Sequence, residues 1–142
     1  MEIVITIKIE ENELVKVNVE QHEAKPVDTY SAYARFYDES CPGWVNDAEY
    51  NLTFLKLQET YANYILKTRG SLYLNEVYDL LGIPRSKAGQ VVGWVYDTEN
   101  PSGDNYVDFG LTEERASKFI NGYTRSILLD FNVDGNIWER LA

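Results

Sequence analysis

The clearest pattern in the chain is an alternation of hydrophobic and polar residues over its first twenty positions. Isoleucine occupies every second position over residues 3–9, and valine does so over residues 15–19. Successive side chains of a strand point to opposite faces, so each run predicts a β-strand with one buried face. The polar residues 11–13 suit a tight connection, and residues 1–20 are therefore expected to form an antiparallel hairpin. An isolated hairpin is marginally stable in water, so its isoleucine face should dock on the domain or on a partner.

Spacing of three and four residues replaces this alternation in the middle of the chain and predicts one long helix. The helix should begin near Asn46-Asp47 and end at Gly70, since Asx residues cap helix starts and glycine caps helix ends. Its apolar positions are expected to face the core. These positions are Tyr50, Phe54, Leu57, Tyr61 and Tyr64.

Two short helices are predicted on either side of the long one. Residues 29–39 should form the first, which ends before Pro42-Gly43 and carries three tyrosines on one face. The second should cover residues 76–81, with Asn75 as its N-cap and Gly82 as its end. The three tyrosines are Tyr30, Tyr33 and Tyr37.

Alternation returns in the last third of the chain. Residues 91–96, 106–109 and 127–133 each predict a strand. The Asn-Pro-Ser-Gly sequence within residues 97–104 predicts a loop. Thr112 should cap a helix that ends at Gly122, because Glu113 and Glu114 favour the positive end of its dipole.

Together these elements predict an α+β fold in a single domain of residues 1–142. Its parts are a β-hairpin (1–20), a helical part with one long helix (29–84) and a C-terminal part of mixed strands and helix (90–142). A chain of this length buries roughly two-thirds of its unfolded surface, so a core is possible without disulfides or metals.

Charge and composition narrow the classes of function. The formal net charge is −10 and the pI is near 4.5, which argues against a nucleic-acid or membrane partner, since both need a basic surface. Residues 1–20 lack the basic start and continuous apolar run of a signal peptide. We therefore expect a cytoplasmic protein, with no cofactor and no metal.

One long phrase of the sequence resembles a known group of proteins. Residues 74–84 read Leu-Asn-Glu-Val-Tyr-Asp-Leu-Leu-Gly-Ile-Pro, and they are followed by Gly93-Trp94 and by Val107-Asp108-Phe109. This pattern, within residues 29–137, resembles small uncharacterised proteins encoded by phages and prophages of Gram-positive bacteria. Those proteins carry hydrophobic membrane-type helices at the front, whereas this chain has a predicted hairpin there. The resemblance implies an origin and no particular activity.

A calcium-like motif is the sharpest chemical signal. Residues 130–135 read Asp-Phe-Asn-Val-Asp-Gly, the first half of a calcium loop, in which oxygen ligands occupy alternate positions. Position twelve, which needs a carboxylate, is Leu141, and Glu139 stands at position ten. The same residues continue an apolar alternation into an Asp-Gly turn. We therefore favour a strand and turn, and predict no calcium binding of physiological strength.

The chain has one cysteine and one histidine that could serve nucleophilic catalysis. A thiol–imidazole site requires the fold to bring Cys41 beside His22, in a chain with no other cysteine or histidine. A metal-dependent or cysteine enzyme is therefore an alternative that we do not favour, and the chain is expected not to be an enzyme.

The remaining signals point to a protein partner. Acidic residues are in excess over residues 1–50 and 97–142, whereas residues 51–96 are slightly basic. The leading hypothesis is a phage-type accessory protein whose acidic surface mimics nucleic acid and inhibits a host defence or nucleic-acid enzyme. The alternatives are a solvated acidic surface with no such role, and a virion or tail assembly protein. The candidate contacts are Asp97, Glu99, Asp104 and Asp108, together with Tyr30, Tyr33 and Tyr37.

Overall fold

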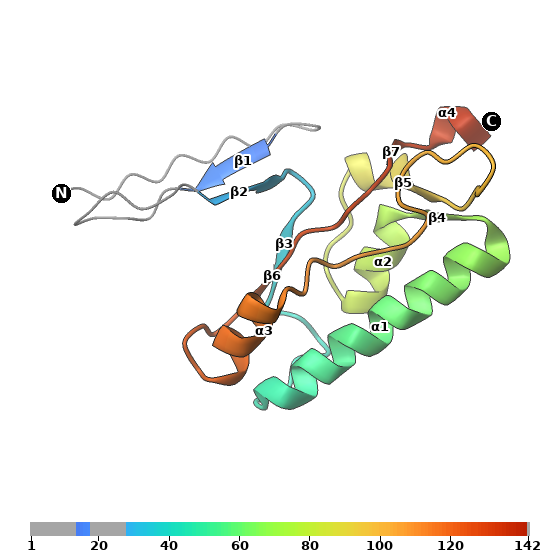
Figure 1. The fold of residues 1–142 in the computed structure, drawn as a ribbon. Coiled ribbons are helices and arrows are strands. Elements are labelled where there is room, and N and C mark those ends of the chain that lie inside the picture. The colour runs from blue at the N-terminus through green and yellow to red at the C-terminus, as the bar shows by residue number, and fades with distance from the viewer. Residues whose placement is uncertain (1–13, 18–27, 142) are drawn as a thin grey trace. The chain divides into compact units, whose positions relative to one another are not determined.

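A computed structural model of the protein describes residues 14–17 and 28–141, and its contacts divide the chain into two compact units, 1–34 and 35–142. In the first unit, β1 (Leu14–Val17) pairs antiparallel with β2 (Asp28–Ser31) (Figure 1). The strand expected over 15–19 and an N-terminal hairpin are therefore present. The strand that pairs with β1 is β2. The predicted pairing with residues 3–9 lies outside the described residues.

The helix predicted over residues 29–39 is wrong. Strand β3 (Arg35–Tyr37) stands in this region instead, and it pairs antiparallel with β6 (Ile127–Leu129). Aromatic residues favour strands wherever a neighbouring strand is at hand to pack against. That neighbour comes from about ninety residues further along the chain, so spacing within 29–39 carries no sign of it.

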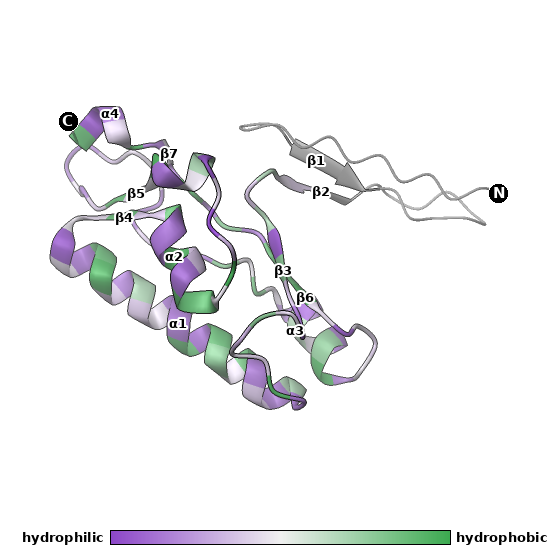
Figure 2. Cartoon of the chain, turned by 180° about the vertical axis from the view of Figure 1, so that it is seen from behind, coloured by the Kyte–Doolittle hydropathy of each residue, from purple (hydrophilic) through white to green (hydrophobic). Residues whose placement is uncertain are grey.

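Helix α1 (Ala48–Arg69) has the predicted ends. The Asp47 side chain accepts a hydrogen bond from the backbone N–H of Tyr50, and Gly70 ends the helix in the left-handed conformation. Hydrophilic and hydrophobic residues are mixed along the whole helix (Figure 2).

The predicted core face of α1 is wrong, because the buried positions are mostly aliphatic and lie on the other side. Aliphatic side chains let β4, α2 and α3 pack closely on α1. Phe54 is half-buried, and the rest of the predicted face is exposed. The buried residues are Asn51, Leu52, Leu55, Ala62 and Leu66.

The remaining elements surround a three-stranded antiparallel sheet in the order β4-β5-β7. Its strands are β4 (Ser71–Tyr73), β5 (Val92–Val95) and β7 (Gly135–Asn136). The helices are α2 (Leu74–Leu81), α3 (Glu113–Ile120) and α4 (Trp138–Leu141). None of the helices in the described residues combines the length and apolar character that a membrane span needs.

Aromatic rings fill the centre of the second unit. Phe131 contacts both Tyr78 and Phe109 edge-on, with ring centroids 5.7 Å and 5.3 Å apart. Trp94 of β5 is fully buried. Because these rings come from α2, β5 and two irregular segments, the core ties distant parts of the chain together and fixes the irregular segments in place.

Candidate functional site

Residues 106–110 run extended through the second unit without joining a sheet, so the strand predicted over 106–109 is wrong. Four consecutive backbone N–H groups donate to side-chain oxygens in place of a neighbouring strand. The backbone oxygens of Asp108 and Phe109 accept the backbone N–H groups of Asn132 and Asp130, so side chains replace a strand on the N–H side of the segment only. The bonds run from Val107 to Asn63 (2.7 Å), Asp108 to Asn132 (2.7 Å), Phe109 to Glu59 (2.8 Å) and Gly110 to Asp108 (2.7 Å).

Asn132 is the centre of this arrangement. Its Oδ1 accepts from the backbone N–H of Asp108 and from the indole N–H of Trp94 at 2.9 Å. Its Nδ2 donates to the carboxylate of Asp104 and to the backbone oxygen of Tyr106, both at 3.0 Å. These four bonds use the full hydrogen-bonding capacity of the amide, so Asn132 fixes the positions of both aspartates.

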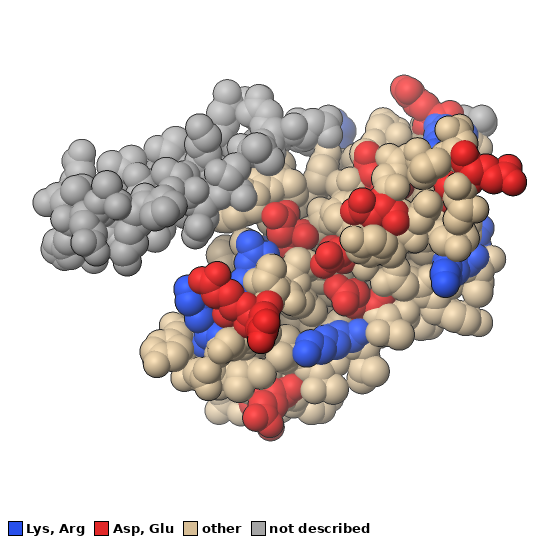
Figure 3. Space-filling model, in the orientation of Figure 1, with Lys and Arg blue, Asp and Glu red and all other residues tan. Residues whose placement is uncertain are grey.

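Two further carboxylates extend this pair into a group that we call the acidic row: Glu59, Asp104, Asp108 and Asp134. Burial raises the pKa of Glu59, and the negative charge of Asp108 raises it further against the bond from Phe109. Burial likewise raises the pKa of Asp134, with a contribution from the charge of Asp104. Figure 3 shows the face of the molecule that is turned to the viewer in Figure 1. Acidic side chains gather in the middle of this face, over the segment that joins β5 to α3.

Asp134 marks the end of the row nearest the loop that follows β5. One of its oxygens accepts the backbone N–H of Val95 at 2.9 Å. The other is buried with no hydrogen-bond partner among the described residues. A Cβ at Gly103 would overlap this second oxygen, so only glycine lets the loop lie against the carboxylate. Like Asn132, Asp134 therefore serves internal contacts where the calcium-like motif would need a ligand.

Asp97 belongs to a different acidic group. One carboxylate oxygen accepts the backbone N–H groups of Glu99 and Asn100, and the other pairs with Arg140 at 2.7 Å. The bond from Asn100 is the main cause that lowers the pKa of Asp97, and Arg140 adds to it. Asp97 thus serves to fold the loop, and Glu99 is exposed next to it.

The four acidic candidates are therefore split between these two groups. The structure brings Asp104 and Asp108 together, and it adds Glu59 and Asp134, which sequence reasoning did not select. Asp134 carried a signal as part of the calcium-like motif. Glu59 carried no such signal in the sequence, because it lies on α1, 50 residues before the Phe109 whose N–H it binds.

The three candidate tyrosines do not share an exposed helix face. Tyr30 is half-buried in β2, Tyr33 is buried, and the boundary between the two units separates both from Tyr37. Tyr37 is fully buried against the rings of Trp44 and Phe54, and burial raises its pKa to about 12.

Neither enzyme alternative gains a site from the described residues. Cys41 is buried, and His22 lies outside the described residues, so their pairing stays untested. Within residues 14–17 and 28–141, no three Asp, Glu, His or Cys side chains are placed to hold a metal ion.

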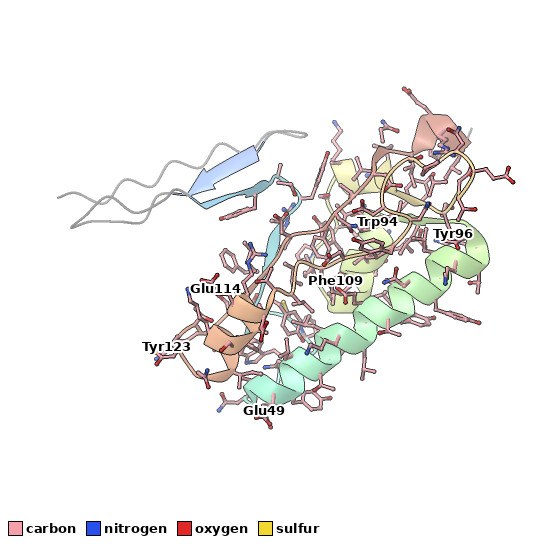
Figure 4. The ribbon with its side chains drawn as sticks, in the orientation of Figure 1. Glu49, Trp94, Tyr96, Phe109, Glu114 and Tyr123 are labelled. Carbon is pink, nitrogen blue, oxygen red and sulfur yellow. The ribbon has the colours of Figure 1, made fainter. Side chains whose placement is uncertain are left out.

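A surface hollow of about 650 Å³ lies between the start of α1 and the end of α3. Trp44 and Phe119, which contact each other edge-on, form part of its wall. Glu49 and Tyr123 lie at this end of the molecule (Figure 4). The aspartates that line it have internal tasks, since Asp38 binds Ser40 and Asp47 caps α1. Glu39 and Arg125 also line the hollow, so its polar groups carry both signs of charge, unlike the acidic row.

The resemblance noted in the sequence rests on a phrase made of segments 74–84, 93–94 and 107–109, and residues of this phrase hold the fold together. Asn75, the expected N-cap of α2, stands inside that helix, and its amide exchanges two hydrogen bonds with the backbone of Ser86, each 2.9 Å long. Gly93 lets β4 approach β5, because a Cβ there would overlap the Leu72 backbone. Trp94 anchors Asn132. The phrase therefore marks a fold, and only Asp108 within it belongs to the acidic row.

The chain belongs to a family of unknown function, DUF6353, whose model matches residues 2–141. No curated protein and no solved structure matches it. The description of the family names no activity, so the case for a function rests on the geometry above.

Proposed function

We propose that this DUF6353 protein acts by binding another protein, without catalysis, through the acidic row. The observation that carries the proposal is the grouping of four carboxylates around Asn132 and residues 106–110, where burial first and a neighbouring carboxylate second raise the pKa of Glu59 and of Asp134. Among the described residues, no member of the row takes part in an ion pair. Carboxylates crowded in this way gain from the approach of a cationic group, so the row favours a basic partner surface.

The rigidity of the row adds to this preference. Each of three carboxylates accepts a hydrogen bond from a fixed N–H group, so these side chains have little freedom to lose on binding: Asn132 donates to Asp104, the Gly110 backbone to Asp108, and the Phe109 backbone to Glu59. Preorganised groups bind with a smaller entropy cost, and complementary charge speeds association.

The nature of the partner follows from the same chemistry. A host defence or nucleic-acid enzyme is the proposed target, because such proteins present basic grooves that a row of carboxylates can fill. The phage-like phrase supports a partner in the cytoplasm of a bacterial host. The alternative is assembly into a virion or tail.

The proposal is tested by capture from a bacterial host lysate on three immobilised forms of the chain. One is the wild type and one is the row variant Glu59→Gln/Asp104→Asn/Asp108→Asn. The third changes Glu39, Glu99 and Glu113 to Gln, three exposed acids outside the row, and so has the same net charge as the row variant. We expect a protein that the wild type and this control retain, that the row variant loses, and that raised salt releases.

Equal loss of binding in both variants would show that only net charge matters and would refute a specific role for the row. Retention by all three forms would place the interaction elsewhere on the chain. Once a partner is purified, association rates at two salt concentrations give the second test. Rates that do not change with salt would contradict an electrostatic contact.

A further inference from the structure

One face of α1 carries large side chains that stay half exposed or more. Over 22 residues the helix is about 33 Å long. At 100° per residue, its four large exposed residues fall within a sector of about 60°, opposite the buried aliphatic face. We call them the aromatic stripe: Tyr50 (53% exposed), Leu57 (61%), Tyr61 (50%) and Tyr64 (63%).

The stripe is an ordered surface. The rings of Tyr61 and Tyr64 stack on each other, 6.5 Å apart and 15° from parallel. Tyrosine is enriched at protein interfaces because it offers rigid apolar area with a polar tip. A continuous stripe of this kind on one helix is typical of a helix that packs against another element.

The spacing of the stripe is symmetric about its middle. Tyr50 stands seven residues before Leu57, and Tyr64 stands seven residues after it. If two α1 helices pack antiparallel with their Leu57 residues in contact, each Tyr50 lies opposite Tyr64 of the other copy. A twofold axis needs a surface that is complementary to itself in this manner.

The charges beside the stripe fit the same arrangement. Glu49 in the first turn and Lys67 in the last turn are 18 residues, or five turns, apart and lie on the same flank of the stripe. Both are exposed, and neither takes part in an ion pair among the described residues. Antiparallel packing about a twofold axis keeps this flank of both copies on one side and brings Glu49 of each copy near Lys67 of the other. Parallel packing would place the two flanks on opposite sides of the pair and would leave these charges unpaired. Antiparallel helix dipoles also attract each other.

We propose that the chain forms a homodimer in which the α1 helices pack antiparallel about a twofold axis at Leu57. Half-exposed side chains of this size bury on the order of 100 Å² each, so two copies bury about 800 to 1,000 Å², near the lower limit of specific interfaces. The dimer is therefore weak, with a dissociation constant of about 10 to 100 µM. Glu59 projects from the opposite side of α1, so both acidic rows stay free.

The test is sedimentation equilibrium of the full chain from about 1 µM to about 500 µM, which spans the expected dissociation constant. The wild type should pass from monomer to dimer. Leu57→Glu and Leu57→Lys place like charges opposite each other at the axis, and each should weaken the dimer about tenfold or more. Tyr123→Glu, which changes the most exposed tyrosine outside α1, should dimerise like the wild type.

Mixed and compensating variants test whether the two helices pack antiparallel with their Leu57 residues in contact. An equimolar mixture of Leu57→Glu and Leu57→Lys should dimerise again, because residue 57 then meets an opposite charge. Glu49→Lys should weaken the dimer, and the double variant Glu49→Lys/Lys67→Glu should restore it. A wild type that stays monomeric throughout would overturn the proposal and leave the stripe to another protein or to residues of the same chain. A dimer that Leu57→Glu does not weaken, or a mixture that does not dimerise, would overturn it as well.

Discussion

Two groups of carboxylates in the second unit are held in opposite ways. The Asp97 group is compensated: backbone N–H groups and Arg140 surround the carboxylate, and its pKa is lowered. The acidic row is crowded: the pKa values of Glu59 and Asp134 are raised, in part by neighbouring carboxylates. Groups of the fold already balance the charge of a compensated carboxylate. A crowded carboxylate is instead stabilised when a cation approaches it. The comparison thus separates acids that build the loop from acids that suit a partner.

The largest expected effect comes from removing the centre of the row. Asn132→Ala leaves the Asp108 backbone N–H without its acceptor, while the Trp94 indole N–H keeps only its bond to the backbone oxygen of residue 132. An unpaired buried donor costs about 1–3 kcal/mol, so the free energy of unfolding should fall by about 1–3 kcal/mol in urea denaturation. The matched control is Asn121→Ala, which removes one exposed side-chain bond to Ser117. Equal stability of the two variants would show that Asn132 does not hold the row.

The second effect is on the pH dependence of stability. The raised pKa of Glu59 and Asp134 means that the folded state binds their protons more tightly than the unfolded state does. Their cost to stability therefore falls as the pH drops from 7 towards the unfolded pKa of about 4. The lowered pKa of Asp97 acts oppositely, since its contribution is present above that value and is lost as the pH falls through the folded pKa.

The wild-type melting temperature should accordingly rise as the pH falls from 7 towards about 4. It should fall at lower pH, where Asp97 and Asp79, whose pKa values are lowered, take up protons. Glu59→Gln should flatten the rise, because it removes one crowded charge while keeping an oxygen that can accept the bond from Phe109. Glu99→Gln removes an exposed charge outside the row and should keep the profile of the wild type. If Glu59→Gln retained the full rise, crowding at Glu59 would not be its source.

The sequence predicts helix ends well because their signals are local. Asp47, Gly70 and Thr112 cap helices where the sequence places them, and each acts within a few residues of its own position. The buried face of α1 was not predictable from spacing alone, because Leu52 and Leu55 give the same periodicity on the other side. Only the burial of one face by β4, α2 and α3 decides between the two.

Long-range partners explain the other errors. Strand β3 depends on β6, and residues 106–110 depend on side chains from α1 and from Asn132. Half of the acidic row was predicted, because Asp104 and Asp108 lie in one acidic segment of the sequence. Glu59 joins them only through the tertiary structure. The sequence thus predicted the segment that holds Asp104 and Asp108. It did not predict which residues from other segments join them.

A smaller effect is expected from the compensated group. Arg140→Ala removes the ion pair with Asp97 and the bond to the backbone oxygen of Asn100. Both partners are partly exposed, so the loss of stability should be smaller than that of Asn132→Ala. Association with any partner of the row should stay within about twofold of the wild type, since the row keeps all its charges. A larger effect on association than that of the row variant would reverse the comparison.

The smallest expected effect is that of calcium, for which a crowded acidic row is the natural place to look. In the calcium-like motif, the side-chain amide of Asn132 already makes four hydrogen bonds. One oxygen of Asp134 accepts the Val95 N–H. Ligation would require these bonds to break, and Leu141 stands where the closing carboxylate would be needed. Calcium at about 1 mM should therefore leave the melting temperature unchanged, whereas a ligand with a dissociation constant of about 10 µM would stabilise the fold by about 2.7 kcal/mol at that concentration. Calorimetric titration gives the direct measurement, and a dissociation constant at or below about 10 µM would show that the row is an ion site instead of a surface for a basic protein.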